Sequence, residues 1–318
     1  MKARTGGAPS SEGVRAGLLA GIAAYAIWGL FPLYLKQIET VPALEVVAHR
    51  IVWSLPFGAL VLTVLKQWRE VTAAFARPHV VARLALAATL IAVNWLVYVW
   101  CVANDRVLQA SLGYYINPLI FIATGVVVLR ENLNRLQIAA VILAAIGVLV
   151  LTIGAGVFPW PSFVLALSFT TYGYVRKTTP VGAMPGLFIE VALLAPLAAG
   201  YLLFLWSGGG GAFASEGTTI DLFLAAAGPA TVIPLALFAL AARRLRLSTL
   251  GFLQYIGPTG QLLLGLYYGE EFTAAHGVCF ALIWSALALI SFDAVQRNRH
   301  ETREAAIIQS AAASPNNS

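Results

Sequence analysis

The sequence predicts an all-α integral membrane protein with ten transmembrane helices, arranged as two inverted five-helix repeats. Three observations carry this prediction: the composition, a series of apolar runs of membrane-spanning length, and a motif repeated at a fixed offset. In the composition, 59% of the residues are apolar and 11% are charged, whereas soluble domains average roughly 45–50% and about 25%. Such a chain has too little polar surface to coat a soluble globule, so it belongs in a bilayer.

Ten apolar runs lie between the charged residues. Each has about the 20 residues that an α-helix needs to cross a hydrocarbon core about 30 Å thick. No other stretch reaches the roughly 50 residues that a domain usually requires, so we expect no soluble domain beside the tails 1–14 and 295–318. In chain order the runs are 15–35, 44–65, 81–103, 108–129, 135–153, 159–178, 184–206, 219–241, 247–268 and 274–294.

The first run, 15–35, follows Lys2, Arg4 and Arg15 and therefore has the charge layout of a signal peptide. It is longer than the roughly 7–15 apolar residues of such a peptide, and nine more runs follow it. We expect it to remain as an uncleaved first helix.

The basic residues predict the orientation of the helices. If the N-terminus is cytoplasmic, 17 Lys and Arg fall on the cytoplasmic side, while Lys36 and Arg106 fall outside and Arg50 lies in a run. Because cytoplasmic loops carry an excess of Lys and Arg, this count predicts that both termini are cytoplasmic. The net charge of +6 then reflects orientation, and we expect no nucleic-acid partner.

A repeated motif divides the chain into two halves. The stretch "YYINPLIFIATGVVVLREN" at 114–132 aligns without a gap on "QYIGPTGQLLLGLYYGEEF" at 254–272, at an offset of 140 residues. The same offset places the third to fifth runs on the eighth to tenth, which gives repeats 15–153 and 159–294. Five crossings in each repeat turn the second upside down, an arrangement typical of secondary transporters. The alternative is that the biased composition produced the matching residues.

Each copy of the motif contains a proline within an apolar run, Pro118 in the first and Pro258 in the second. A proline inside a helix removes a backbone hydrogen bond, and in a bilayer the freed carbonyl is tolerated beside protein or a water-lined cavity. The sequence therefore predicts two helix breaks that line a central pathway, although prolines that only shape helix packing are the alternative. The substrate-binding residues expected around the breaks are Tyr115, Asn117, Gln254, Tyr255 and Gln261.

Four ionisable residues lie inside predicted helices: Glu45, His49 and Arg50 in the second run and Glu190 in the seventh. Such groups are costly at membrane depth, usually face a bundle interior and mark substrate or proton pathways. We expect these four, with Asn94 of the third run, to bind substrate. Arg50 can hold a carboxylate, and His49 or Glu190 can carry a coupling proton. The structural alternative is an ion pair of Arg50 with Glu45 or Glu190.

The sequence lacks signatures of ATP-driven transport and of zinc proteases, because it has neither a Gly-rich loop ending in Lys-Ser/Thr nor a His-Glu-x-x-His motif. We expect no cofactor and no metal, and we interpret Cys101 and Cys279 as small buried hydrophobic residues. A second function class stays open, an intramembrane enzyme that acts on a lipid or amphiphile with Glu45 and His49 as an acid/base pair.

Six phrases, spread over nearly the whole chain, carry a family resemblance. They are "AHRIVWS" at 48–54, "NWLVYVW" at 94–100, "ASLGYYINP" at 110–118, "PVGAMPGLFIE" at 180–190, "RLRLSTLGFLQYIGPT" at 244–259 and "FALIWSALAL" at 280–289. Together they resemble the RarD-type permeases of the EamA group in the drug/metabolite transporter superfamily.

The resemblance implies a ten-helix permease of the inner membrane with two inverted halves. Its expected partners are the lipid bilayer and a small organic metabolite or drug. The chain departs from the family pattern at Gln109, Phe121 and Arg130. The positions that match the family motifs are Glu45, His49, Arg50, Asn94, Asn117, Glu190, Gln254 and Tyr255.

Overall fold

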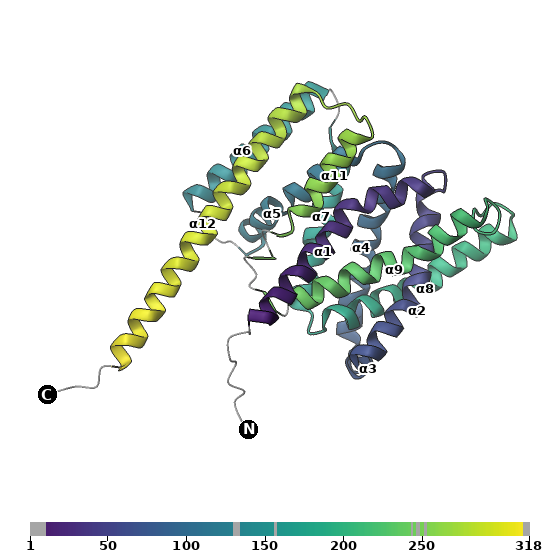
Figure 1. The fold of residues 1–318 in the computed structure, drawn as a ribbon, viewed down its shortest axis with the longest axis horizontal. Helices are drawn as coiled ribbons and strands as arrows, with labels where there is room; N and C mark the ends of the chain where they lie inside the picture. Colours follow the sequence, from purple (N-terminus) through teal and green to yellow (C-terminus); the bar gives the residue numbers. More distant parts are fainter. Residues whose placement is uncertain are drawn as a thin grey trace. The chain divides into compact units, whose positions relative to one another are not determined.

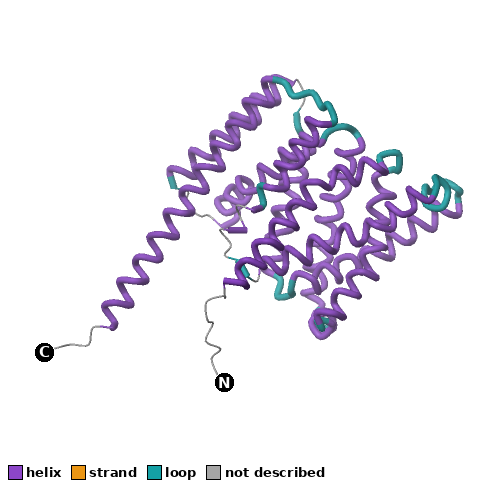
Figure 2. Tube along the Cα trace, viewed as in Figure 1, coloured by secondary structure: helices purple, strands orange, loops and turns teal. Residues whose placement is uncertain are grey.

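The structure, a computed structural model, describes residues 11–129, 134–155, 158–242, 244–245, 249–250 and 253–313, and all regular elements in these ranges are helices (Figures 1 and 2). The elements are α1 (Ser11–Leu35), η1 (Lys36–Ile38), α2 (Ala43–Leu65), α3 (Trp68–Phe75), α4 (Pro78–Ala103), α5 (Val107–Leu129), α6 (Arg135–Ala155), α7 (Trp160–Thr178), α8 (Ala183–Ser207), α9 (Thr218–Ala242), α11 (Ile256–Tyr267) and α12 (Ala274–Ala313).

Within the described residues, seven helices are long and apolar enough to cross a membrane. The all-helical membrane fold is therefore confirmed, while ten crossings in two repeats remain a prediction. Helices α5 and α7 coincide with the predicted runs 108–129 and 159–178 but are not among the seven. For α7 the physical reason is its hydroxyl-bearing and basic side chains, which dilute its hydropathy.

Two further differences from the predicted runs concern short or polar segments. The predicted loop 66–80 contains α3, an amphipathic helix that buries Val71 and Ala74 and exposes Trp68 and Phe75. Helix α12 continues to Ala313, beyond the predicted end of its run at 294. Strong helix formers such as Ala, Glu, Arg and Gln dominate this extension, so the helix persists where the hydropathy falls.

The chain divides into two compact units. The first comprises residues 1–117 and 159–271, and its core forms where α2 packs against α8 and α9, α1 against α9 and α11, and α4 against α7. The second comprises residues 118–158 and 272–318, in which α6 and α12 pack along each other.

Glycines let the helices of the first unit approach closely. A Cβ atom at Gly260 of α11 would lie 3.0 Å from the Cα atom of Gly29 in α1. A Cβ atom at Gly228 of α9 would lie 2.2 Å from the backbone oxygen of Trp53 in α2. Small residues at such crossings are how membrane helices gain packing contacts.

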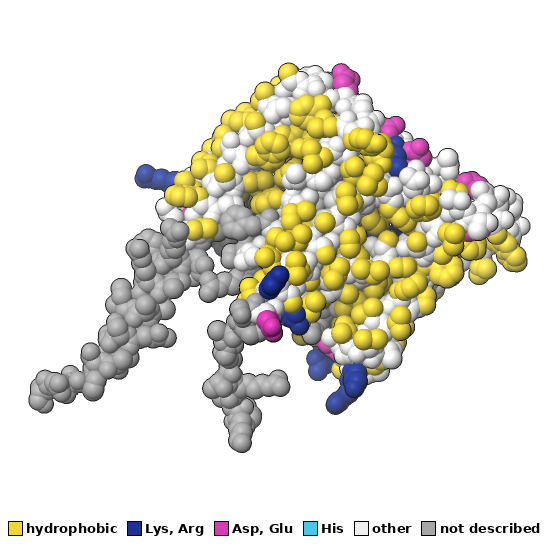
Figure 3. Space-filling view, in the orientation of Figure 1, with side chains coloured by type: hydrophobic (Ala, Val, Ile, Leu, Met, Phe, Trp, Pro, Cys, Tyr) yellow, Lys and Arg dark blue, Asp and Glu magenta, His cyan; other side chains and the backbone are white. Residues whose placement is uncertain are grey.

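Contacts between loops show which helix ends lie together at each of the two ends of the first unit. At one end, Lys36 Nζ lies 2.6 Å from Asp105 Oδ1, and the Thr40 hydroxyl donates to Glu216 over 3.4 Å. At the other end, Arg83 donates to the Thr178 carbonyl over 3.0 Å. Figure 3 shows most of the visible acidic side chains along one edge of this unit and basic side chains along the opposite edge.

Candidate functional site

Arg50 is buried in the first unit, with 6% of its surface exposed. Its Nε donates to the Thr231 hydroxyl of α9 over 2.6 Å, and its guanidinium carbon lies 4.1 Å from the ring centroid of Trp95 and 5.0 Å from that of Phe31. Neither ion pair that the sequence suggested for Arg50 forms: Glu45 lies against His49 and the Ala212 N–H, and Glu190 pairs with Arg176. In the described part of the chain, no carboxylate lies within 4.0 Å of this cation.

Five aromatic residues surround Arg50, and we call them the aromatic box: Phe31 and Tyr34 of α1, Trp95 and Tyr98 of α4, and Tyr114 of α5. Successive rings touch, with centroids 5.3 Å apart for Phe31 and Tyr34, 6.2 Å for Phe31 and Tyr98, and 5.9 Å for Tyr98 and Tyr114. The Tyr98 hydroxyl is buried and has no hydrogen-bond partner among the described residues.

Asn94 holds one residue of this box, Tyr114, in place through a hydrogen bond. Its Oδ1 accepts a hydrogen bond from the Tyr114 hydroxyl over 3.1 Å, and its Nδ2 donates to the Leu165 carbonyl and the Ser168 hydroxyl, each over 3.0 Å. The predicted polar residue of the third run therefore orients an aromatic wall and ties α4 to α7.

Glu45 and His49 form a second buried cluster on α2, with 4.0 Å between Glu45 Oε1 and His49 Nε2. The loop between α8 and α9 covers them, since the Ala212 N–H donates to Glu45 Oε1 over 2.7 Å. The Phe213 ring lies 5.1 Å from the His49 ring and 6.3 Å from that of Trp53. Both nitrogens of His49 lack hydrogen-bond partners in the described residues. The sequence alone predicts no role for this loop.

Glu190 of α8 is fully buried and has a partner that the sequence did not assign. Its Oε1 lies 3.2 Å from Nε of Arg176, and its Oε2 accepts a hydrogen bond from the Tyr172 hydroxyl over 3.2 Å. Arg176 Nη2 also donates to the Gly182 carbonyl over 2.9 Å. A Cβ atom at Gly186 would lie 2.0 Å from Arg176 Nη1, so only glycine leaves room for this arrangement.

A series of ring contacts joins the aromatic box to the Glu190 pair. The Tyr114 ring lies 6.0 Å from that of Phe169, and Phe169 lies 6.2 Å from Tyr172, whose hydroxyl binds Glu190. The two buried charges, Arg50 and Glu190, are thus connected through adjacent aromatic side chains within one unit.

The two copies of the repeated motif differ in the structure. Helix α5 continues through Pro118, whereas residues 254–255 form a turn and α11 begins at Ile256, just before Pro258. The segment before Pro118 lies against this turn: the Tyr115 and Tyr255 rings stack at 6.3 Å, and the Tyr115 and Thr259 hydroxyls are 2.6 Å apart.

An open depression of about 430 Å³ lies beside the second motif. Its lining includes Tyr255 but neither Gln254 nor Gln261. Gln261 is buried and donates to the Trp28 carbonyl over 3.3 Å, and Asn117 Oδ1 is buried without a partner among the described residues. The lining residues are Tyr255, Ile256, Thr259, Gly260 and Leu263.

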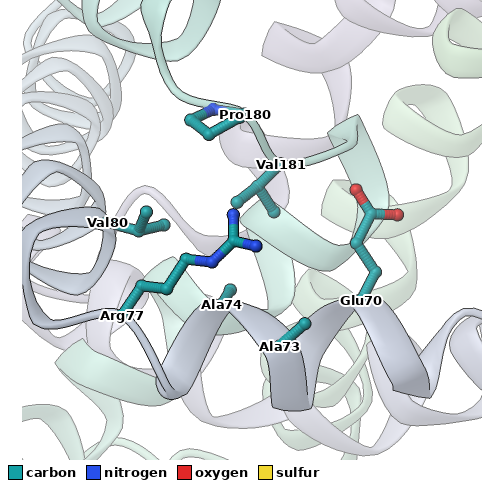
Figure 4. Close-up of a pocket in the computed structure, with 7 residues that line it drawn as sticks. All are labelled: Glu70, Ala73, Ala74, Arg77, Val80, Pro180 and Val181. Carbon is teal, nitrogen blue, oxygen red and sulfur yellow. The ribbon is translucent and has the colours of Figure 1, made fainter.

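A cavity of about 40 Å³ lies between α3, the start of α4 and residues 180–181 (Figure 4). Figure 4 shows the guanidinium of Arg77 directed toward Val181, with Glu70 on the other side of that residue. The volume admits water but no organic substrate. Among the described residues, no cluster of three or more His, Cys, Asp and Glu is placed to hold a metal ion.

Comparisons with known proteins identify relatives over most of the chain. The EamA-like transporter family model matches residues 15–153. An uncharacterized transporter of Pseudomonas aeruginosa is 47% identical, covering 90% of this chain and 96% of that protein. Protein RarD of Streptomyces exfoliatus is 46% identical, with 90% and 91% covered, and Protein RarD of Escherichia coli is 43% identical, with 91% and 98% covered.

One solved structure aligns with a TM-score of 0.56 and covers 86% of this chain and 96% of its own. Its sequence identity is 17%, so this likeness concerns the fold alone.

Proposed function

The chain belongs to the RarD-type permeases of the EamA-like transporter family, and from this premise we propose that it is a secondary transporter that moves a small organic metabolite or drug across the bacterial inner membrane. The observation that carries the proposal is the pair of buried charged centres, Arg50 and Glu190, joined by adjacent aromatic rings. Buried ionisable groups are costly in a membrane protein and mark substrate or proton pathways.

The proposed architecture has ten crossings in two inverted repeats, 15–153 and 159–294, with the tails 1–14 and 295–318 in the cytoplasm. The loop contacts support it, because the loops after α1, α4 and α8 meet at one end of the first unit and those flanking α3 and α7 at the other. In such a repeat each half presents one gate, and the substrate is bound between the gates near the bilayer midplane.

The proposed substrate-binding residues divide into three groups. The first group is the aromatic box with Arg50 and Asn94. The second group comprises the charged residues on either side of the box: Glu45 and His49 under the 207–218 loop, and Glu190 with Arg176 at the opposite end of α8. The third group lies at the second motif and at the segment of α5 that packs against it. The residues of this group are Tyr115, Asn117, Gln254, Tyr255 and Gln261, beside Pro118 within α5 and Pro258 in the first turn of α11.

Transport is testable before the substrate is known. Proteoliposomes and protein-free liposomes would be incubated with a small-molecule extract of bacterial cytoplasm, and their contents would be compared by mass spectrometry. We expect at least one compound to enter proteoliposomes faster and to remain chemically unchanged. Equal entry would contradict the proposal, and conversion of a lipid or amphiphile would favour the intramembrane enzyme instead.

We also propose that the transport is coupled to protons through Glu190 or His49, because the sequence has no nucleotide-binding motif to supply work. With the compound found above, an imposed pH gradient should accelerate entry into wild-type proteoliposomes. Glu190→Gln should lose this acceleration while it retains counterflow exchange, and Glu12→Gln, on the exposed face of α1, should behave as wild type. Entry that ignores the gradient in the wild type would refute proton coupling but leave transport standing.

A further inference from the structure

The charge of Arg50 has no counterion in the described part of the chain. A guanidinium remains protonated in proteins, and a buried charge without a partner costs free energy. The neighbours of this guanidinium are the Thr231 hydroxyl and the faces of Trp95 and Phe31. These neutral groups stabilise the cation in part, but they leave a net positive charge inside the bundle.

The terminal nitrogens of Arg50 are also free to bind. Its one hydrogen bond to a described residue comes from Nε, so the N–H groups of Nη1 and Nη2 are not used. A planar guanidinium with both terminal nitrogens available matches a carboxylate, which accepts two parallel hydrogen bonds. Tyr98, 4% exposed, adds a buried hydroxyl without a partner to the same box.

The charge balance selects the class of anion. A single cation is neutralised by a monoanion, whereas a phosphate dianion would leave an excess negative charge in the box. Two buried carboxylates of the unit lie outside the box: Glu190 pairs with Arg176, and Glu45 accepts the Ala212 N–H through Oε1, while its Oε2 has no partner among the described residues. None of the five residues of the aromatic box carries a carboxylate, so the ammonium group of a zwitterion would have no counterion within the box.

We propose that Arg50 binds the carboxylate of the transported substrate and that the aromatic box holds a planar apolar body attached to it. The substrate class is therefore an aromatic or planar unsaturated monocarboxylate. Flat rings stack offset or edge-to-face on the aromatic side chains, and the series Tyr114, Phe169 and Tyr172 continues the same lining toward Glu190. That the bound carboxylate is a substrate rests on the proposed transport function, but its binding is measured without transport.

The test uses the purified full chain in detergent and three probes of similar shape: cinnamate, its neutral analogue cinnamamide, and zwitterionic phenylalanine. Binding is measured as the rise of the thermal unfolding temperature with ligand concentration, because a ligand that binds only the folded state stabilises it. The variants are Arg50→Gln, Arg50→Lys and Tyr98→Phe. The matched control is Arg106→Gln, since Arg106 also lies over an aromatic ring, that of Trp100 at 5.2 Å, but outside the aromatic box.

We expect cinnamate to bind the wild type and Arg106→Gln at millimolar or lower concentrations, and cinnamamide and phenylalanine to bind at least about 10-fold more weakly. Loss of the charged hydrogen bonds should weaken cinnamate binding about 10- to 100-fold in Arg50→Gln and less in Arg50→Lys, which keeps the charge but loses the fork. Tyr98→Phe preserves the ring and should weaken binding only modestly, so it reports on the box even if Arg50→Gln does not fold.

The inference is overturned if cinnamate does not stabilise the wild type at millimolar concentrations, if cinnamamide binds as well as cinnamate, or if both Arg50→Lys and Tyr98→Phe bind cinnamate with wild-type affinity. Flux in proteoliposomes is scored separately. Flux of an extract compound without carboxylate binding would refute this inference and keep the transport proposal. Carboxylate binding without any flux would keep this inference and refute the transport proposal.

Discussion

Glu190 and Arg176 place two opposite charges in the interior of the first unit, with Glu190 fully buried and Nε of Arg176 3.2 Å from its Oε1. Desolvation of both groups offsets much of their attraction, so such a pair adds little net stability. Removal of one partner is different, because it leaves the other charge buried and alone. The pair therefore ties α7 to α8, and the loss of either charge leaves the other without its partner.

Single neutralisation of this pair should destabilise the fold more than double neutralisation. We expect Arg176→Gln to lower the unfolding free energy by about 3–5 kcal/mol, since it strands the Glu190 carboxylate. Adding Glu190→Gln should recover a large part of this loss. The measurement is a double-mutant cycle of unfolding in detergent. Strictly additive effects of the two substitutions would show that the side chains do not interact.

The sequence could predict the buried charges but not their partners. Arg50, Glu45 and Glu190 stand out because each interrupts an apolar run. Arg176 does not, because it lies at the end of its run, where a basic residue is already explained by cytoplasmic orientation. Its pairing with Glu190 depends on how α7 and α8 cross, and that is tertiary information.

At the scale of elements, hydropathy predicts helix bounds well where a run is uniformly apolar. The runs 44–65 and 184–206 correspond to α2 (Ala43–Leu65) and α8 (Ala183–Ser207). Hydropathy does not predict helix α3, because its eight residues, three of them polar, form no membrane-length run. Hydropathy also does not predict the packing of the 207–218 loop on α2, because this packing depends on one backbone N–H and one phenyl ring.

The loop between α8 and α9 acts as a cover over His49, and weakening it should expose this imidazole. Phe213→Ala removes the ring that lies over His49 and Trp53. We therefore expect faster modification of His49 by diethyl pyrocarbonate, read by peptide mass spectrometry. His79, on the exposed start of α4, is the internal control and should react at the same rate in both proteins. Unchanged reactivity of His49 would mean that other residues shield it.

The first turn of α5 is held by Glu270, which follows α11 and accepts the N–H groups of Val107 and Leu108 over 2.5 and 2.8 Å. Helix N-termini leave such donors without intrahelical partners, and a carboxylate there also complements the helix dipole. Burial nevertheless raises the pKa of Glu270 above its ordinary value, and this effect outweighs the two hydrogen bonds.

The raised pKa of Glu270 sets the sign of a pH effect on stability. A group that is harder to ionise in the fold stabilises it below the unfolded pKa, and this contribution is lost as the pH rises through the folded pKa. The unfolding temperature of the wild type relative to Glu270→Gln should therefore fall as the pH is raised from about 4 to about 7. The same comparison with Glu12→Gln, on the exposed face of α1, controls for general effects. A rise in the difference would mean that hydrogen bonding to the carboxylate dominates.

At the scale of the whole molecule, the two copies of the repeated motif are alike in sequence and different in structure. Pro118 lies within the continuous helix α5, while Pro258 lies in the first turn of α11, where its missing N–H costs nothing. If the halves are inverted, as we propose, unequal local structure at the two motifs fits alternating access, in which one gate is closed while the other is open.

The parity of the membrane crossings decides whether the halves are inverted at all. Seven of the described helices qualify as spans by length and hydropathy, and seven crossings from a cytoplasmic N-terminus would leave the C-terminus outside. Ten crossings return it to the cytoplasm. The contacts Lys36 to Asp105 and Thr40 to Glu216 hold the loops after α1, α4 and α8 at one end. Both counts place these three loops on the same side, so the location of the C-terminus decides between them.

We therefore expect a fluorescent protein fused after Ser318 to fluoresce and alkaline phosphatase at the same site to be inactive, since the first matures in the cytoplasm and the second outside it. Phosphatase inserted after Gly210, in the loop that covers α2, should be active. The two fusions are matched, because helices α9, α11 and α12 lie between them: an odd number of crossings in this stretch gives opposite readings, and an even number gives the same. An active phosphatase at both sites would contradict the ten crossings and, with them, the proposed inverted repeat.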